Sequence, residues 1–282
     1  MPTSPVIAVT GSTGAVGGRV ARDLAARGIP QRLLVRDASR APVLDGAEVH
    51  VARYSDRDAA RSALQGVQTL FMVSASETAD RVKHHRTFVE AAAEAGVQAI
   101  VYTSFFAAAP DAVFTLGRDH AATEDIIRTS NMRWTFLRDN FYMDMMELFA
   151  GDDGVIRGPA GDGRCSLVSR SDVAATAVSV LLDPSAHANT AYDLTGPEAL
   201  TMAEVAEKIS AVRGHPVRYV DETVEEAYAS RAAFGAPRWQ VDAWVSTYTA
   251  IASGDLAGVS GDVERVTGRP AQSFEEFLGA VA

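Results

Sequence analysis

Short runs of β-branched and apolar residues alternate with longer stretches of helical hydrophobic spacing from residue 5 to about residue 138. This alternation is typical of right-handed βαβ units, so it predicts an α/β fold with a doubly wound parallel sheet of the Rossmann type. The expected strands are 6–10, 32–35, 49–52, 69–73, 100–103 and 135–137. The expected helices between them are 15–27, 56–64, 81–95 and 118–129, and Ser55 is the predicted N-cap of the second helix.

The pattern changes after Asn140, where a methionine-rich helical stretch at 142–149 precedes a glycine-rich segment at 151–163. A helix expected at 172–182 packs back on the first domain. Further helices are expected at 202–212, 224–233, 241–252 and 274–281, with a strand at 217–220. We therefore expect a Rossmann domain over residues 1–150, with 165–195 packed against it, and a smaller, mainly helical lobe over 196–282.

Charge and cysteine content narrow the choice of partners and compartment. The chain has 26 basic and 36 acidic residues, and its net charge of −10 disfavours nucleic acids and anionic membranes as partners. Cys165 is the single cysteine, so the chain forms no internal disulfide and has no cysteine cluster for zinc. The sequence has no run of 18 apolar residues and no basic leader at its start, so we expect a cytoplasmic protein that does not span a membrane.

A glycine-rich motif lies between the first predicted strand and the first predicted helix. Gly11, Gly14 and Gly17 form a Gly-x-x-Gly-x-x-Gly pattern. At this place the first glycine permits a tight turn, the second lets a pyrophosphate approach the backbone, and the third lets the helix lie close to the sheet. The helix N-terminus adds free N–H groups and a positive dipole. A glycine-rich turn without a ligand is the alternative, but the position between strand and helix favours a dinucleotide.

The residue after the second predicted strand discriminates between the dinucleotides. A carboxylate at this place hydrogen-bonds the ribose 2′-hydroxyl of NAD, whereas this chain has Arg36, with Arg40 nearby. A guanidinium suits a 2′-phosphate by charge and by bidentate geometry, so the sequence favours NADP(H) as the cofactor. Asp37 keeps NAD open as the alternative, because its carboxylate follows immediately.

Several segments along the chain form a recognisable set. They are the phosphate loop, the strand ending in Arg36, 71–77 (FMVSASE), 102–104 (YTS), His120-x-x-x-Glu124 and 137–142 (LRDNFY). Together they resemble the NmrA-like branch of the atypical short-chain dehydrogenases, in which the NADPH-dependent quinone oxidoreductases are the most similar group and the triphenylmethane reductases are nearby. The resemblance implies an NADP-binding domain over residues 1–150, a helical substrate lobe over 196–282 that closes a cleft, and two-electron reduction of quinones.

The chain departs from this family pattern at two positions near the expected cofactor. Arg138-Asp139 stands where members carry an Arg-Asn pair, with Asn140 one place later. Arg53 stands where an acidic residue usually follows the third strand. The position of the carboxamide near the nicotinamide and the contacts on the adenine side are therefore expected to differ.

The Tyr-x-x-x-Lys pair of ordinary short-chain dehydrogenases is absent. The two lysines, Lys83 and Lys208, are preceded at the required spacing by alanine and glutamate. The resemblance puts His120 at the lysine position and Leu116 at the tyrosine position. Quinone reduction tolerates this loss, because hydride addition yields a hydroquinone anion that is far less basic than an alkoxide. The protein then has to hold the ring about 3 to 3.5 Å from the nicotinamide C4 and to exclude water.

The resemblance and the strand ends together give two sets of candidate site residues. Expected to bind the cofactor are Gly11, Ser12, Thr13, Gly14, Ala15, Val16, Arg36, Ser74, Ala75, Ser76, Thr103, Ser104 and Phe141. Expected at the reacting end are His120, as proton donor or hydrogen-bond donor, and Asn140, Tyr142 and Phe105. Each has a plain structural alternative, since the histidine can be a packing residue, the serines loop caps and the aromatics core. No metal or flavin is implied.

Two other groups of residues have no assigned function at this point. The basic stretch around His84 and His85 is interpreted as a solvated helix face rather than a metal site. The aromatic residues at 239, 244 and 248 are compatible with a lid, a dimer surface or core, which leaves a homodimer open.

The sequence thus predicts an NADPH-dependent reductase that transfers a hydride to a quinone or a similar planar, electron-poor acceptor. The alternative is a redox sensor of the NmrA type, which binds NAD(P) and signals its state to a partner without turnover. The missing Tyr-Lys pair fits both hypotheses. The VSASE segment at 73–77 and the likeness to the reductases favour the enzyme.

Overall fold

The computed structural model of the chain describes residues 7–280. The chain folds into two compact units, each assembled from several segments. Unit 1 comprises Met1–Ser104, Asp119–Arg138 and Val173–Tyr192, and unit 2 comprises Phe105–Arg118, Asp139–Asp172 and Asp193–Ala282. The division at residues 150 and 196 expected from the sequence concerns cofactor and substrate binding, and it stays a prediction.

Seven strands form one sheet in the order β3-β2-β1-β4-β5-β6-β9. Their bounds are β1 Ile7–Thr10, β2 Gln31–Val35, β3 Ala47–Val51, β4 Thr69–Met72, β5 Ala99–Phe105, β6 Arg133–Asp139 and β9 Thr190–Leu194. The pairs from β3 to β5 are parallel, which confirms the doubly wound fold expected from the sequence. The strand order reverses between β1 and β4, and the carboxyl ends at such a switch point are where open α/β sheets bind ligands.

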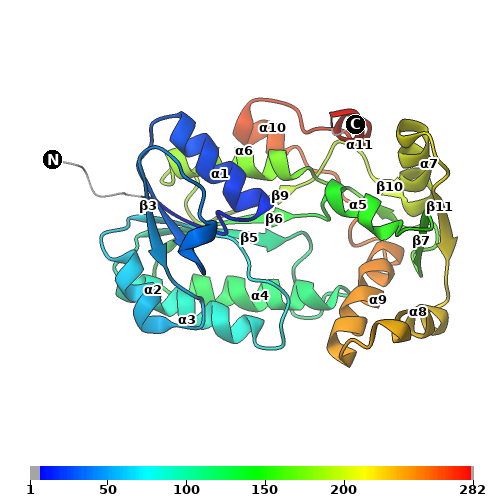
Figure 1. The fold of residues 1–282 in the computed structure, drawn as a ribbon, viewed down its shortest axis with the longest axis horizontal. Helices are drawn as coiled ribbons and strands as arrows, with labels where there is room; N and C mark the ends of the chain where they lie inside the picture. Colours follow the sequence, from blue (N-terminus) through cyan, green and yellow to red (C-terminus); the bar gives the residue numbers. More distant parts are fainter. Residues whose placement is uncertain (1–6, 281–282) are drawn as a thin grey trace. The chain divides into compact units, whose positions relative to one another are not determined.

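Helices cover both faces of the sheet. Helices α1 (Ala15–Ala26) and α6 (Arg170–Leu182) lie on one face, and α2 (Arg57–Leu64), α3 (Arg81–Glu94) and α4 (Thr115–Arg128) lie on the other (Figure 1). Each helix turns an apolar stripe toward the strands, as helical spacing of apolar residues requires. The layer under α2, α3 and α4 buries large side chains completely, including Leu64, Phe88, Tyr102, Ile127 and Phe136.

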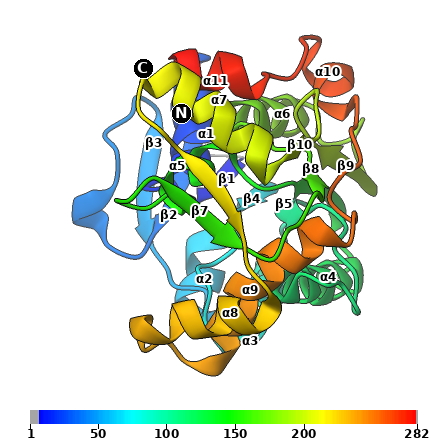
Figure 2. The ribbon, with the colours of Figure 1, turned by 90° about the vertical axis from the view of Figure 1, so that its right-hand side faces the viewer.

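Unit 2 combines short strands with helices around its own core. Strands β7 (Val155–Gly158) and β11 (Arg218–Asp221) pair in parallel, and β8 (Arg164–Cys165) and β10 (Leu200–Thr201) pair antiparallel. Its helices are α5 Met143–Phe149, α7 Met202–Arg213, α8 Val224–Arg231, α9 Arg238–Ala252, α10 Asp262–Thr267 and α11 Phe274–Ala280. Figure 2 shows α7 beside α11 and α8 beside α9, and these helix pairs are in contact. Capping boxes at Thr201 and Thr223 begin α7 and α8.

The structure corrects several expected elements. The N-cap of α2 is Asp56 rather than Ser55, since the Asp56 carboxylate accepts a hydrogen bond from the Ala59 N–H. The glycine-rich segment 151–163 contains β7, a strand too short to stand out among glycines, and β9 and α10 were also missed. The first residue of the first predicted strand, Val6, and the last of the final predicted helix, Val281, lie outside the described residues.

Candidate functional site

The turn between β1 and α1 brings the backbone of the helix close to the end of the strand. Gly11 has a φ of +64°, a conformation that favours glycine. A Cβ on Gly17 would lie 2.5 Å from backbone atoms of Gly11 and Thr10, so a side chain there would push α1 away from β1. The N-cap residue Gly14 offers no side chain to the N–H groups of the first turn. These groups and the helix dipole form the expected anion site at the carboxyl edge of the sheet.

The buried hydroxyl of Ser12 supports a ligand at this turn. Its Oγ is buried and has no hydrogen-bond partner among the described residues. Leaving a buried polar group unpaired costs about 1–3 kcal/mol, and a phosphate oxygen would satisfy it. The glycine backbone and this hydroxyl therefore fit a diphosphate group.

The residues after β2 match the needs of a 2′-phosphate. The Asp37 carboxylate accepts hydrogen bonds from the hydroxyl and the N–H of Ser39, at 2.7 and 2.9 Å, and thereby caps the 3₁₀ helix η1 (Ala38–Arg40). These two hydrogen bonds lower the pKa of Asp37. Arg36 and Arg40 are exposed. The Asp37 carboxylate, which kept NAD open as the alternative, is thus engaged by its own loop, and the binding of a 2′-phosphate by Arg36 stays a prediction.

The segment 73–75, which follows β4, is held by side chains from the neighbouring strands. The Val73 N–H donates to Thr10 Oγ1 at 2.8 Å, and the Val73 carbonyl accepts from the Tyr54 hydroxyl at 2.6 Å. The Ser74 N–H donates to Thr103 Oγ1 at 2.8 Å. Thr103, expected to bind the cofactor, thus fixes the backbone of Ser74, which has the same expected role.

Two side chains of α3 hold the backbone N–H and carbonyl of Ala75. The Ala75 N–H donates to His85 Nε2 at 2.9 Å, and the Ala75 carbonyl accepts from Arg81 Nε at 3.0 Å. Because His85 Nε2 accepts, its proton is on Nδ1, which faces Thr123 Oγ1 at 2.8 Å. Burial lowers the pKa of His85 to about 3, so the imidazole is neutral at pH 7.

His85 and Arg81 overturn one interpretation of the sequence. Both side chains are buried, whereas Lys83 and Arg86 on the same helix are exposed. The stretch is therefore a solvated face only in part, and its inward face supports the segment 73–75. The sequence carried no signal of this role, because the partner of His85 is a backbone amide ten residues earlier.

His120 is buried and faces two protein groups. Its Nε2 lies 3.0 Å from Arg81 Nη2, and since a guanidinium only donates, this nitrogen accepts. Its Nδ1 lies 3.1 Å from the Tyr102 hydroxyl. Burial, together with the charge of Arg81, lowers the pKa of His120 well below its usual value. The structure places His120 beside the supports of segment 73–75, and its expected role as proton donor stays a prediction.

Glu124 joins the ends of β5 and β6. Its carboxylate, 1% exposed as a side chain, accepts from Ser104 Oγ at 2.6 Å and from Nε and Nη2 of Arg138 at 2.9 and 2.7 Å. Arg128 adds a fourth hydrogen bond at 2.7 Å. The segments around 102–104, 120–124 and 137–138 therefore meet at one buried carboxylate.

Asn140 is saturated by hydrogen bonds within unit 2. Its Nδ2 donates to Ser166 Oγ at 2.8 Å and to the Leu256 carbonyl at 3.0 Å. Its Oδ1 accepts from the Phe141 N–H at 2.8 Å and from Cys165 Sγ at 3.2 Å. This arrangement favours a structural role for the amide, and its expected contact with the substrate stays a prediction.

The aromatic candidates of unit 2 pack on one another. The ring of Phe105 lies 4.7 Å from that of Phe114 and 5.1 Å from that of Phe141, measured between centroids, and Phe114 and Phe141 are also 5.1 Å apart. Phe105 and Phe114 are buried and Phe141 is half-buried in the core of unit 2. The three rings form one packed aromatic group in the core of unit 2.

Asp139 is the buried carboxyl group that sequence reasoning did not assign to the site. The Tyr142 hydroxyl donates to its Oδ2 at 2.7 Å, while its Oδ1 is buried without a hydrogen-bond partner among the described residues. Burial raises the pKa of Asp139 well above its usual value. Burial and the neighbouring carboxyl also raise the pKa of Tyr142, whose ring lies 4.8 Å from the Arg170 guanidinium. The only hint in the sequence was the departure from Arg-Asn at this position.

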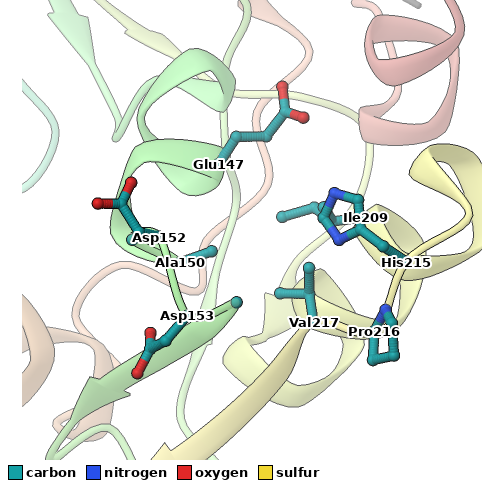
Figure 3. Close-up of a pocket in the computed structure, with 10 residues that line it drawn as sticks. Glu147, Ala150, Asp152, Asp153, Ile209, His215, Pro216 and Val217 are labelled. Carbon is teal, nitrogen blue, oxygen red and sulfur yellow. The ribbon is translucent and has the colours of Figure 1, made fainter.

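A separate pocket of about 400 Å³ lies within unit 2 and contains none of the predicted site residues. Figure 3 shows Glu147 and Asp152 on one side and Ile209, His215 and Val217 on the other. Glu147 pairs with Arg213 and Asp153 with Arg157, so two of its acids are neutralised. Within residues 7–280, no three His, Cys, Asp or Glu side chains gather as a metal site, and no helix has the length and apolar content for a membrane crossing.

Comparison with known proteins adds an independent finding. The model of the NmrA-like family matches residues 3–237, more than half of the chain. The chain belongs to the NmrA-like family. The NAD(P)H azoreductase of Xenophilus azovorans is 37% identical over 282 residues, 98% of each chain.

Solved structures agree with this family assignment. The NADPH-dependent quinone oxidoreductase of Escherichia coli, in complex with NADPH, is 30% identical to this NmrA-like protein with a TM-score of 0.88, over 98% of this chain and 99% of that one. The triphenylmethane reductase of Citrobacter sp., in complex with NADP(H), is also 30% identical, with a TM-score of 0.85 over 98% of this chain and 100% of that one.

The support of segment 73–75 predicts a difference between two substitutions of His85. His85→Gln keeps an acceptor for the Ala75 N–H, so it should leave stability nearly unchanged. His85→Leu leaves that N–H unpaired, whereas the Thr123 hydroxyl still donates to the Asp119 carbonyl, so this substitution should lower the free energy of unfolding by about 1–3 kcal/mol. Urea denaturation measures both, with the neighbouring His84→Leu as the control. Equal stability of His85→Leu and His84→Leu would contradict the network.

Asp139 predicts a pH-dependent stability. Its folded-state pKa is raised above the unfolded value of about 4, so the wild type loses stability as the pH rises above that value. Asp139→Asn is neutral at every pH. Its stability relative to wild type should therefore increase from pH 4 to pH 8 in urea denaturation. The exposed Asp58→Asn is the control, and a relative stability of Asp139→Asn that is constant over this range would refute the burial of an ionisable group.

Proposed function

We propose that this NmrA-like protein is an NADPH-dependent reductase that transfers a hydride to a planar, electron-poor acceptor such as a quinone or an azo compound. The observation that carries the proposal is the turn at β1 and α1, where glycine backbone and the unpaired Ser12 hydroxyl fit a diphosphate. The similarity to the azoreductase, the quinone oxidoreductase and the triphenylmethane reductase extends over nearly the whole chain and supports the reaction class.

In this proposal the residues of unit 1 bind the cofactor. Residues 11–16 hold the diphosphate and Arg36 the 2′-phosphate, while 74–76 with Thr103 and Ser104 position the nicotinamide half. The nicotinamide supplies the hydride. Since the backbone of 73–75 is fixed by hydrogen bonds to buried side chains, this segment offers a ligand a preformed surface rather than a mobile loop.

Quinone reduction requires little from the protein beyond holding the cofactor and the acceptor in position. A hydroquinone anion is far less basic than an alkoxide, so a proton taken from water completes the reduction without a Tyr-Lys pair. We propose that His120 orients Arg81, because its Nε2 accepts from that guanidinium. Phe105, Asn140 and Tyr142 are proposed on the substrate side, with residues 196–282 as the substrate lobe.

We also propose a cytoplasmic location, where glutathione keeps a lone thiol such as Cys165 reduced. A small molecule is the expected partner, since a net charge of −10 opposes nucleic acid. A homodimer, which the sequence left open, is a further candidate partner.

NADPH oxidation followed by absorbance tests the reductase proposal directly. The purified protein, tested with benzoquinones, naphthoquinones and azo dyes, should consume NADPH and prefer it to NADH. Arg36→Ala should raise the KM for NADPH about 10- to 100-fold, the worth of a charge-assisted hydrogen bond, with little effect on NADH. The exposed Arg27→Ala is the matched control.

Two outcomes would count against the proposal. A folded protein that binds NADPH but oxidises none of it with any acceptor favours the alternative, an NmrA-type redox sensor without turnover. Equal losses for NADPH and NADH in Arg36→Ala would remove the assignment of Arg36 to the 2′-phosphate.

A further inference from the structure

The loop after β3 presents an arginine beside the one that follows β2. Val35 is paired with Val51 in the sheet, and the Ala52 N–H donates to the Val35 carbonyl at 3.0 Å, which continues the pairing past both strands. Arg36 follows Val35 and Arg53 follows Ala52, so this register puts Arg53 one residue beyond Arg36 at the same edge of the sheet. Because neighbouring strands lie about 4.8 Å apart, the two backbones leave that edge close together.

Arg53 is held in place from both sides along the chain. The Ala52 hydrogen bond fixes the residue before it. The Tyr54 hydroxyl fixes the residue after it, because it donates to the Val73 carbonyl at 2.6 Å and lies 2.7 Å from Thr10 Oγ1. The Tyr54 ring stacks on Phe88 with centroids 4.2 Å apart. The backbone of Arg53 is thus anchored against the ends of β1 and β4, where the phosphate turn begins.

The two carboxylates of these loops, Asp37 and Asp56, both cap helices. Asp37 caps η1 through Ser39, and Asp56 caps α2 through the Ala59 N–H at 3.0 Å. Arg36, Arg40 and Arg53 are exposed, and none of them forms an ion pair within the described part of the chain. In a chain with a net charge of −10, exposed arginines that follow two neighbouring strands form a local site for an anion.

We propose that Arg53 is a specificity-determining residue that holds the 2′-phosphate of NADP(H) together with Arg36. The inference rests on the proposed function, since it needs a dinucleotide whose diphosphate lies at the turn of β1 and α1. A phosphate monoester carries close to two negative charges at pH 7, and two guanidinium groups from adjacent strands match it in charge and in donor geometry. An acidic residue at position 53 would repel the same phosphate.

Two probes that differ by the 2′-phosphate alone test this assignment. Calorimetry with adenosine 2′,5′-bisphosphate and with 5′-AMP gives the preference of the wild type for the bisphosphate. Arg53→Ala should weaken binding of the bisphosphate about 10-fold or more and change binding of 5′-AMP less than about twofold. Arg53→Asp should weaken binding of the bisphosphate further. Arg53→Lys keeps the positive charge but lacks the planar, bidentate donor geometry of a guanidinium. Its affinity for the bisphosphate should lie between those of wild type and Arg53→Ala. Arg61→Ala, an exposed arginine on α2 that pairs with Asp58, should match the wild type.

The outcomes separate this inference from the proposed function. If wild type prefers the bisphosphate and Arg53→Ala weakens both probes equally, or neither, Arg53 does not read the 2′-phosphate and the inference fails alone. Wild-type protein that binds neither probe nor NADPH would overturn the proposed function and this inference with it. Thermal melts of each variant check that the exposed substitutions leave the fold intact. A loss of affinity for one probe alone is then due to a lost contact with that probe.

Discussion

The close approach of α1 to β1 is the constraint on which the candidate site depends. It requires glycine at position 17, because a Cβ there would lie 2.5 Å from the backbone of the preceding strand and turn. The first N–H groups of the helix, which no N-cap side chain satisfies, and the buried Ser12 hydroxyl belong to the same turn. The position of a diphosphate at this place determines which neighbouring strand ends meet the two halves of a dinucleotide.

Buried side chains of α3 and α4 hold the backbone of the candidate site in place. His85 and His120 both act as neutral acceptors, one for a backbone amide and one for a guanidinium. Glu124 collects four hydrogen bonds where β5 and β6 end. Buried hydrogen-bond networks of this kind favour one geometry of the backbone they hold. The absent Tyr-Lys pair is therefore consistent with a protein whose residues hold a cofactor and an acceptor in place and leave the proton to water.

The sequence predicted the elements that residues close together in the chain determine. The strand and helix periods gave the parallel sheet, and the glycine spacing gave the phosphate turn. Side chains that act through distant backbone could not be found in this way. His85 was assigned to solvent because its neighbours are basic, yet it is buried against Ala75. The hydrogen bonds that hold Asn140 were not predicted either, because its partners Ser166 and Leu256 come from loops far along the chain.

Calorimetric titration of the wild-type chain with NADP⁺ tests the central claim most directly. If the turn of β1 and α1 holds a diphosphate, the titration saturates at one nucleotide per chain, and Ser12→Ala weakens binding without lowering the stability of the protein. A folded wild-type chain that takes up neither NADP⁺ nor NAD⁺ would contradict the account at its base.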